Sequence, residues 1–166
     1  MEIAQKMGEL GFLGIIFPEE YGGAGFTTTE YALIIEEISK IDPSVGLTVA
    51  SHNGLCSNHI YSYSNEALKK KYMPDLTSGK SLGAWGLTEA VSGSDAAGMA
   101  TTADKKDGHY VLNGSKMFIT QGTVGGTYVV TAITDKAKGK KGISAFVLEK
   151  GMKGFTTAPI KHKLGM

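Results

Sequence analysis

The feature of this sequence that most constrains its fold is a change in the spacing of apolar residues near Gly79. Before that point they recur at helical spacing, as in the stripe Tyr31, Ile34, Ile35 and Ile38. Beyond it the apolar segments are short, β-branched or aromatic, and separated by turn residues. Helices followed by strands indicate an α+β fold. We expect a partial helical domain over residues 1–80 and a β-domain over residues 81–166.

Local signals place the boundaries of the expected helices. Thr27 and Glu30 have the spacing of a capping box, in which the two side chains satisfy each other's free backbone amides. Asp42 and Pro43 restart a helix, with aspartate as its cap and proline at its first position. This second helix is rich in small residues, so it can approach another segment closely. A last helix is expected over residues 65–76.

The second half of the chain predicts strands at seven places, near residues 82–89, 98–105, 109–113, 115–120, 127–134, 143–149 and 154–160. Asp107-Gly108 and Asn113-Gly114 lie where tight hairpin turns require positive φ. The chain has 23 glycines, about 14% of its residues where ~7% is typical. That content indicates many turns, or backbone brought close to a bulky group.

Composition argues against several classes of partner. The formal net charge is +1, so nothing electrostatic calls for nucleic acid or an anionic membrane. No apolar run approaches the ~20 residues that span a bilayer, and the first residues carry no signal core, so we expect a cytoplasmic protein. Cys56 is the single cysteine and is expected to pack rather than react. His52 and His59 have no ligand partners at metal-site spacing, so no metal is expected.

Two stretches favour a ligand over ordinary packing. In residues 82–95 the only tryptophan, Trp85, lies between glycines, and the segment then enters a small, hydroxyl-rich loop suited to a ligand with many acceptors. In residues 113–122 alternation places Phe118 and Thr120 on one face, an aromatic surface beside a hydroxyl. A flat heteroaromatic cofactor would use such a surface. On the residues alone, hairpin packing remains the alternative.

These stretches, with three others, resemble the acyl-CoA dehydrogenase family over essentially the whole chain. Five signatures occur in the family's order: Pro18 to Gly25, Lys71 to Gly79, Gly86 to Asp95, Tyr110 to Thr120, and Gly142 to Val147 with Gly154-Phe155. The resemblance implies a helical domain followed by a six- or seven-stranded antiparallel barrel-like domain. It also implies an enzyme that binds FAD and converts a fatty acyl-CoA to its trans-2-enoyl-CoA, with electrons passed to electron-transfer flavoprotein.

The resemblance assigns roles to residues that match the family's motifs. Six should bind the flavin: Trp85, Leu87, Thr88, Phe118, Ile119 and Thr120. Thr88 is expected at the pyrimidine edge, Phe118 against the isoalloxazine and Thr120 near N5. Donors placed there in advance would stabilise the charge that hydride transfer builds on the ring. Ser94 should contact the pantetheine arm of the acyl-CoA.

The sequence departs from the family's pattern at two places. Ala90-Val91 stands where the family usually has Pro-Gly, so the loop before Ser94 is expected to differ in shape. The chain also stops where the family continues into a four-helix domain that holds the base glutamate, so no catalytic residue is expected here. For the full-length protein the resemblance implies a homotetramer, and a short-chain, butyryl-type substrate is our guess. The alternatives are a naturally short, non-catalytic flavin- or acyl-binding module and an oxygen-using acyl-CoA oxidase relative.

Overall fold

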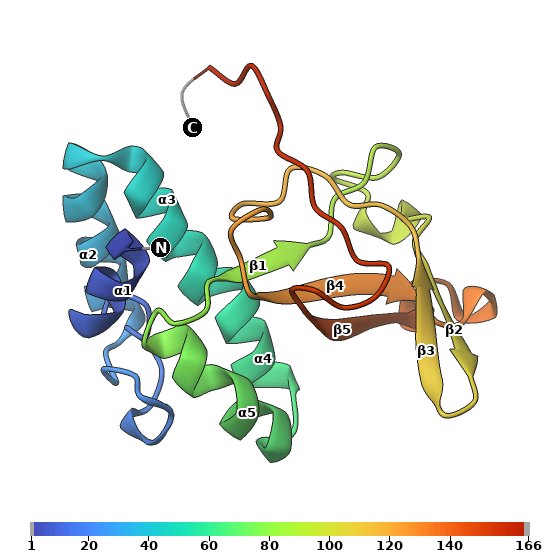
Figure 1. Cartoon of the computed structure of the whole chain (residues 1–166), viewed down its shortest axis with the longest axis horizontal. Helices are drawn as coiled ribbons and strands as arrows, with labels where there is room; N and C mark the ends of the chain where they lie inside the picture. The colour runs from blue at the N-terminus through green and yellow to red at the C-terminus, as the bar shows by residue number, and fades with distance from the viewer. Residues whose placement is uncertain (1, 165–166) are drawn as a thin grey trace.

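A computed structural model describes residues 2–164, with the helices at one end and the sheet at the other (Figure 1). The helices are α1 (Glu2–Glu9), α2 (Thr28–Ile41), α3 (Pro43–Ser51), α4 (Asn58–Tyr63) and α5 (Glu66–Thr77). The strands are β1 (Gly83–Gly86), β2 (Thr102–Lys106), β3 (His109–Asn113), β4 (Thr127–Ile133) and β5 (Ile143–Glu149). Helices and strands are therefore segregated along the chain, which is typical of an α+β fold.

The helix boundaries follow the local signals in the sequence. At the start of α2 the Glu30 carboxylate accepts a hydrogen bond from the Thr27 backbone at 2.8 Å, which completes the predicted capping box. The Asp42 carboxylate caps α3 by accepting from two amides of the first turn, at 2.9 and 3.1 Å. A π-helical turn, His52–Ser57, joins α3 to α4. Asn65 caps α5.

The strands form one mixed, open sheet, so the prediction of an antiparallel barrel-like domain is wrong. Strand β4 is central, with β5 antiparallel along one side and β1 followed by β2 parallel on the other. Strand β3 pairs antiparallel with β2, and within residues 2–164 no pairing joins β3 back to β1 or β5. Parallel pairing arises because a long connection, which contains the β2–β3 hairpin, carries the chain back before β4 begins.

The expected strand at residues 115–120 is absent because its backbone bonds elsewhere. The Met117 N–H donates to the Thr88 carbonyl at 2.9 Å, and Phe118 has φ of 58°, which breaks the extended alternation. Asn113-Gly114 consequently leads into a loop instead of a hairpin turn.

The other predicted hairpin turn is confirmed. Asp107 and Gly108 join β2 to β3 with φ of 45° and 81°. The expected strand at 154–160 is also absent. Phe155 instead anchors this tail as a loop, with its ring edge-on to Tyr128 at a centroid distance of 4.8 Å.

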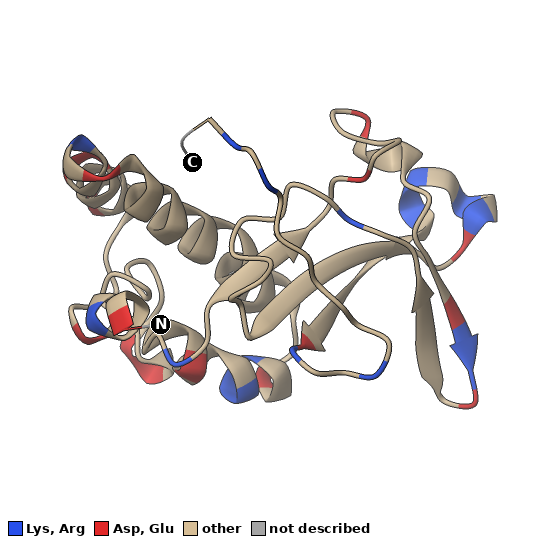
Figure 2. Cartoon of the chain, turned by 45° about the horizontal axis from the view of Figure 1, so that its top comes forward, with Lys and Arg blue, Asp and Glu red and all other residues tan. Residues whose placement is uncertain are grey.

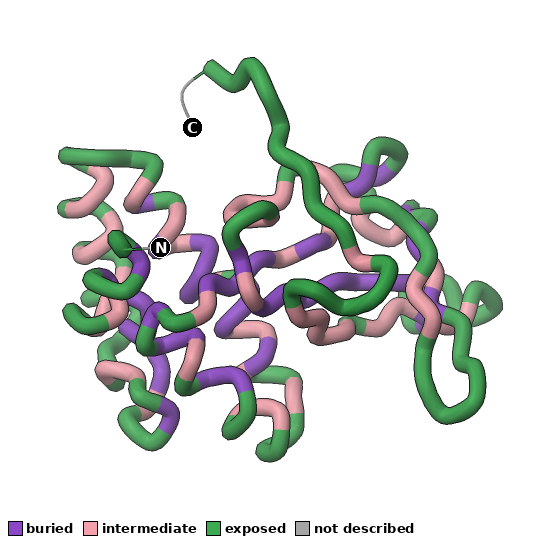
Figure 3. Tube along the Cα trace, viewed as in Figure 1, coloured by how far each residue is buried: buried purple, intermediate pink, exposed green. Residues whose placement is uncertain are grey.

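The buried residues gather where the helices meet the sheet (Figure 3). Phe17, Met73 and Leu76 from the helical part pack with Val129 of β4 in one cluster. Cys56 is a fully buried member of this cluster, and burial raises the pKa of its thiol to about 12. A thiol held neutral in this way packs as a small apolar group, as predicted from the sequence.

Most positions that carry charged residues lie on the helices and on the loops beyond the sheet (Figure 2), whereas Glu89 and Lys116 form a buried pair. The lysines of segment 136–141 are exposed, and Lys138 pairs with Asp135 at 3.3 Å. This segment forms 3-10 turns over Lys136–Gly142, of which residues 136–141 are exposed to solvent. None of the helices in the described part of the chain has the length and apolar character needed to cross a membrane.

Candidate functional site

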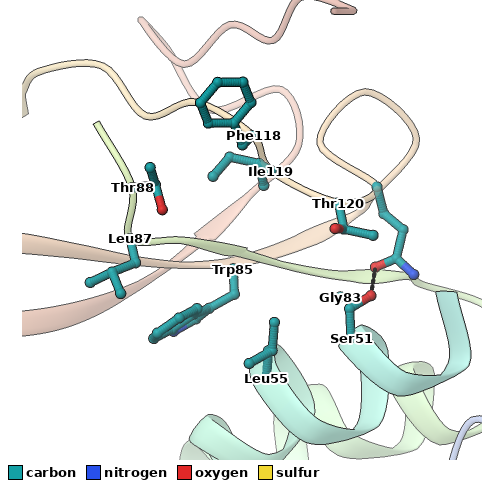
Figure 4. Close-up of a pocket in the computed structure, with 10 residues that line it drawn as sticks. Ser51, Leu55, Gly83, Trp85, Leu87, Thr88, Phe118, Ile119 and Thr120 are labelled. Atoms are coloured by element: carbon teal, nitrogen blue, oxygen red, sulfur yellow. Dashed lines mark hydrogen bonds between the residues drawn. The ribbon is translucent and has the colours of Figure 1, made fainter. Parts of the chain in front are cut away.

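A cleft of about 200 Å³ lies where the helical part meets the end of β1. It is lined by residues from three segments: Ser51, Leu55, Gly83, Trp85, Leu87, Thr88, Phe118, Ile119, Thr120 and Gln121. Figure 4 shows Thr88 and Thr120 on opposite sides of the space, with the Phe118 ring at its outer end and Trp85 and Leu55 across from it. All six residues predicted to bind the flavin line this one cleft.

Strand β1 and the residues after it form the first wall. Trp85 lies on β1, and its ring is 6.2 Å from that of His59 between centroids. The indole Nε1 is buried and has no hydrogen-bond partner among residues 2–164. A buried donor without an acceptor is costly, because its hydration is lost and nothing replaces it. Leu87 and Thr88 follow directly after β1, where the backbone is no longer paired in the sheet.

The second wall is a loop with an unusual backbone. Phe118 and Gln121 have φ of 58° and 64°, in the left-handed region that large side chains seldom adopt. The Gln121 side chain holds this loop against α3, since its Nε2 donates to the Thr48 carbonyl at 2.8 Å. Phe118 is 67% exposed and lies at the mouth of the cleft. Non-glycine residues with positive φ are concentrated at functional sites.

The helical side of the cleft depends on His52, at the start of the π-helical turn. The Gly83 N–H donates to its Nδ1 at 3.0 Å, so Nε2 carries the proton and faces the Leu76 carbonyl at 3.1 Å. Burial lowers the pKa of His52 to about 4, which keeps the ring neutral. The ring thus fixes the first residue of β1 against the helix, while Ser51 and Leu55 face the cleft.

The two walls are connected by a buried ion pair. Lys116 Nζ lies 2.7 Å from Glu89 Oε1, and their side chains are 9% and 4% exposed. Burial alone would raise the pKa of Glu89, but the Lys116 ammonium and backbone amides outweigh it and lower the pKa to about 2. Next to this pair, Met117 is bonded to Thr88 through the backbone. Glu89 is therefore an ionised structural carboxylate and has no free oxygen for general-base work.

Ser94 lies outside the cleft. It is exposed on the loop between β1 and β2 and lines neither the cleft nor a second cavity of about 270 Å³ beside Glu89. Its predicted contact with a pantetheine arm therefore remains a prediction. The second cavity includes Thr101, whose buried hydroxyl has no partner among residues 2–164.

Several residues of the site were not singled out from the sequence. Ser51 and Leu55 could have been found, because they lie four apart on the helix rich in small residues and so share one face. Gln121 and Lys116 contact Thr48 and Glu89, which lie 73 and 27 positions away, and nothing in their local sequence marks them. His52 was considered from the sequence only as a metal ligand, and its bond with Gly83 spans 31 positions. Within residues 2–164 no cluster of three metal-ligating side chains occurs.

Known proteins share both the sequence and this architecture. The family model described as acyl-CoA dehydrogenase, N-terminal domain, matches residues 1–80, and the one described as acyl-CoA dehydrogenase, middle domain, matches residues 84–166. The chain belongs to the acyl-CoA dehydrogenase family. The segments that meet at the cleft lie mainly in the part matched by the family's middle domain.

Individual acyl-CoA dehydrogenases are similar over the whole chain. The short-chain-specific acyl-CoA dehydrogenase of Clostridium acetobutylicum is 45% identical over 166 residues, which are 100% of this chain and 44% of that protein. A chain from the structure of the electron transferring flavoprotein of Acidaminococcus fermentans has a TM-score of 0.94 at 49% identity, covering 98% of this chain and 43% of that one. The acyl-CoA dehydrogenase of Bacillus anthracis in complex with FAD has a TM-score of 0.89 at 41% identity, covering 98% and 28%. This chain thus spans less than half the length of these relatives.

Proposed function

We propose that this chain forms the flavin-facing part of an FAD-dependent acyl-CoA dehydrogenase. The enzyme would convert a short-chain acyl-CoA to its trans-2-enoyl-CoA and pass the electrons to an electron-transfer flavoprotein. The observation that carries the proposal is the single cleft in which Trp85 to Thr88 and Phe118 to Thr120 meet. These segments also lie in two of the five signatures that carry the resemblance to the family in the sequence.

The residues of the cleft suit a flat, polar ring. Phe118 presents an exposed aromatic face, Thr88 and Thr120 present hydroxyls, and Trp85 holds an unpartnered indole donor. Complete small-molecule sites are ~300–1,000 Å³, whereas this cleft is about 200 Å³. We therefore propose that the cleft is one wall of the FAD site and that other parts of the protein supply the rest.

In this arrangement the residues of this chain bind and orient the flavin, and a residue outside the chain carries out the proton transfer. Bound FAD would supply the acceptor for the hydride that leaves the β-carbon of the thioester. Thr88 and Thr120 would donate hydrogen bonds to the ring edges on which negative charge accumulates, and Phe118 would shield a ring face from water. We propose that the glutamate that removes the α-proton lies outside these 166 residues, and that the complete protein is a homotetramer.

Binding of FAD can be tested with the chain alone. Trp85 is the only tryptophan and lies in the cleft, so its emission reports on this site directly. We expect saturable quenching of Trp85 emission as FAD is added, and weaker quenching by FAD in a Thr88→Val, Thr120→Val variant. Free tryptophan titrated with the same FAD concentrations is the control for inner-filter loss. Because the chain is proposed to form one wall of the site, the affinity should be weak; absence of bound flavin from the complete, folded protein would reject the proposed function.

The reaction is tested with the complete polypeptide. Anaerobic butyryl-CoA is expected to bleach the flavin absorbance, and electron-transfer flavoprotein is expected to restore it. The 166-residue chain with added FAD should show no such bleaching on the same timescale, because loss of a general base typically slows a reaction ~10²–10⁴-fold. Rapid reoxidation by air would instead indicate an acyl-CoA oxidase. Bleaching by the chain alone would contradict our placement of the base.

A further inference from the structure

The contacts of the buried pair Glu89–Lys116 indicate a role beyond stabilising the fold. Exchanging such a pair for apolar residues of similar volume is often neutral or stabilising, because each charge loses its hydration on burial. The two side chains are nevertheless almost completely covered, at 4% and 9% exposed. Their contacts, rather than their net energy, indicate what the pair does.

The lysine end fixes the wall that follows β1. Lys116 Nζ donates to the Leu87 carbonyl at 3.1 Å and lies 3.4 Å from Thr131 Oγ1 on β4. Its aliphatic chain crosses β1 at Gly86, where an added Cβ would lie 3.3 Å from Lys116 Cγ. One side chain from the Phe118 loop thus contacts both β4 and the backbone immediately before Thr88.

The glutamate end fixes the loop between β1 and β2. Besides Lys116, the Glu89 carboxylate accepts from the backbone N–H groups of Ala100 and Thr101, at 2.6 and 3.1 Å. The loop that begins at Ala90 and carries Ser94 is therefore closed at its base by one carboxylate. The pair holds three segments that are far apart in the sequence in one arrangement beside the cleft.

We propose that Glu89 and Lys116 are positioning residues, which hold the Trp85–Thr88 wall and the Phe118–Gln121 wall at the separation that a flavin ring requires. The proposal rests on the proposed function. Neither side chain needs to touch the cofactor: each acts through backbone groups next to Thr88 and Phe118. The pair is expected to act as a unit, so that losing either partner has the effect of losing both.

The test compares Glu89→Gln, Lys116→Met and the double variant with a matched pair elsewhere. Lys71 and Glu149 have the same 2.7 Å separation but are 58% and 43% exposed and join α5 to β5 away from the cleft. Lys71→Met and Glu149→Gln are the controls. All measurements are made on the full chain well below its melting temperature, with far-UV circular dichroism as the check of folding.

Two readouts are expected to change in the Glu89 and Lys116 variants only. The Kd for FAD should rise at least tenfold, and quenching of Trp85 emission by iodide should increase about twofold without FAD, because the covering wall is released. The double variant should match the single variants. The two control variants should stay within twofold of the parent in both readouts. A lower melting temperature with unchanged FAD affinity and iodide quenching would show a purely structural role and overturn the proposal.

A milder variant covers the case in which the charge changes prevent folding. Gly86→Ala keeps both charges and displaces the Lys116 chain. The new Cβ would also lie 3.3 Å from Val130 Cγ2. The Gly86→Ala variant is therefore compared with the double variant that combines Gly86→Ala with Val130→Ala, and with the single variant Val130→Ala. FAD affinity should fall several-fold in both Gly86 variants, and unchanged affinity would overturn the proposal. Failure of the complete protein to bind FAD would reject the proposed function, while iodide quenching in the parent chain would still test the positioning role.

Discussion

At the scale of single residues, the cleft is built from conformations that cost energy. Left-handed backbone at a residue such as Phe118 or Gln121 costs on the order of 1–3 kcal/mol. Their neighbours offset this cost, since Met117 bonds to Thr88 and the Gln121 amide bonds to α3. These contacts thus hold Phe118 in a backbone conformation that its own conformational preference would disfavour.

His52 makes stability depend on pH. The folded state holds its pKa at about 4, below the ordinary 6.5, so the folded protein binds fewer protons than the unfolded one between these values. Its contribution is therefore complete above pH 6.5 and decreases as the pH falls toward 4. We expect the free energy of unfolding to fall by about 3 kcal/mol across this range, measured by urea titration at several pH values.

Replacing His52 by a neutral residue isolates its contribution to the pH dependence of the free energy of unfolding. His52→Gln retains an acceptor and a donor but cannot titrate, so this decrease should disappear. The exposed His109 provides the control, and His109→Gln should keep the parent's pH dependence. An identical pH dependence in the parent and in His52→Gln would show that other groups cause it.

At the scale of elements, β1 packs directly on the π-helical turn. A Cβ at Gly83 would lie 2.8 Å from Cys56 Cβ and 2.9 Å from its Sγ, so even alanine forces the strand and the helix apart. Gly83→Ala is expected to lower the free energy of unfolding by about 1–3 kcal/mol, as overpacking in a core does. Gly93→Ala is the matched control, because nothing lies within 4 Å of a Cβ there. Equal stability of the two variants in urea would contradict this close approach.

Elements defined by local chemistry were predictable, and those defined by distant contacts were not. The caps at Thr27 and Asp42 act within one turn, so the sequence alone located the starts of α2 and α3. The segment 115–120 alternates like a strand, but Lys116 and Met117 bind residues 87–89 instead of a neighbouring strand. No local pattern contains that information. The parallel pairing of β1 with β4 was missed for the same reason.

At the scale of the whole molecule, the six residues that the family resemblance assigned to the flavin lie together, although the fold prediction was partly wrong. All six predicted residues line one cleft, even though the sheet is mixed and open and Thr120 is not on a strand. Motif resemblance places residues relative to a site, whereas periodicity places them only within an element. The partners that hold the walls together, Glu89 and Lys116, required coordinates, because their side chains meet across 27 positions of sequence.

The parallel pairing of β1 with β4 also bears on the order in which the molecule can be assembled during synthesis. Gly83 pairs with Thr127, so β1 leaves the ribosome 44 positions ahead of the strand it needs. Until then Trp85 has helices on one side and no partner strand on the other. Pairing between such distant segments is slow, because a long loop must close before any contact compensates for it. The cleft can therefore form only after β4 has been synthesised, later than the packing of the helices that precede it.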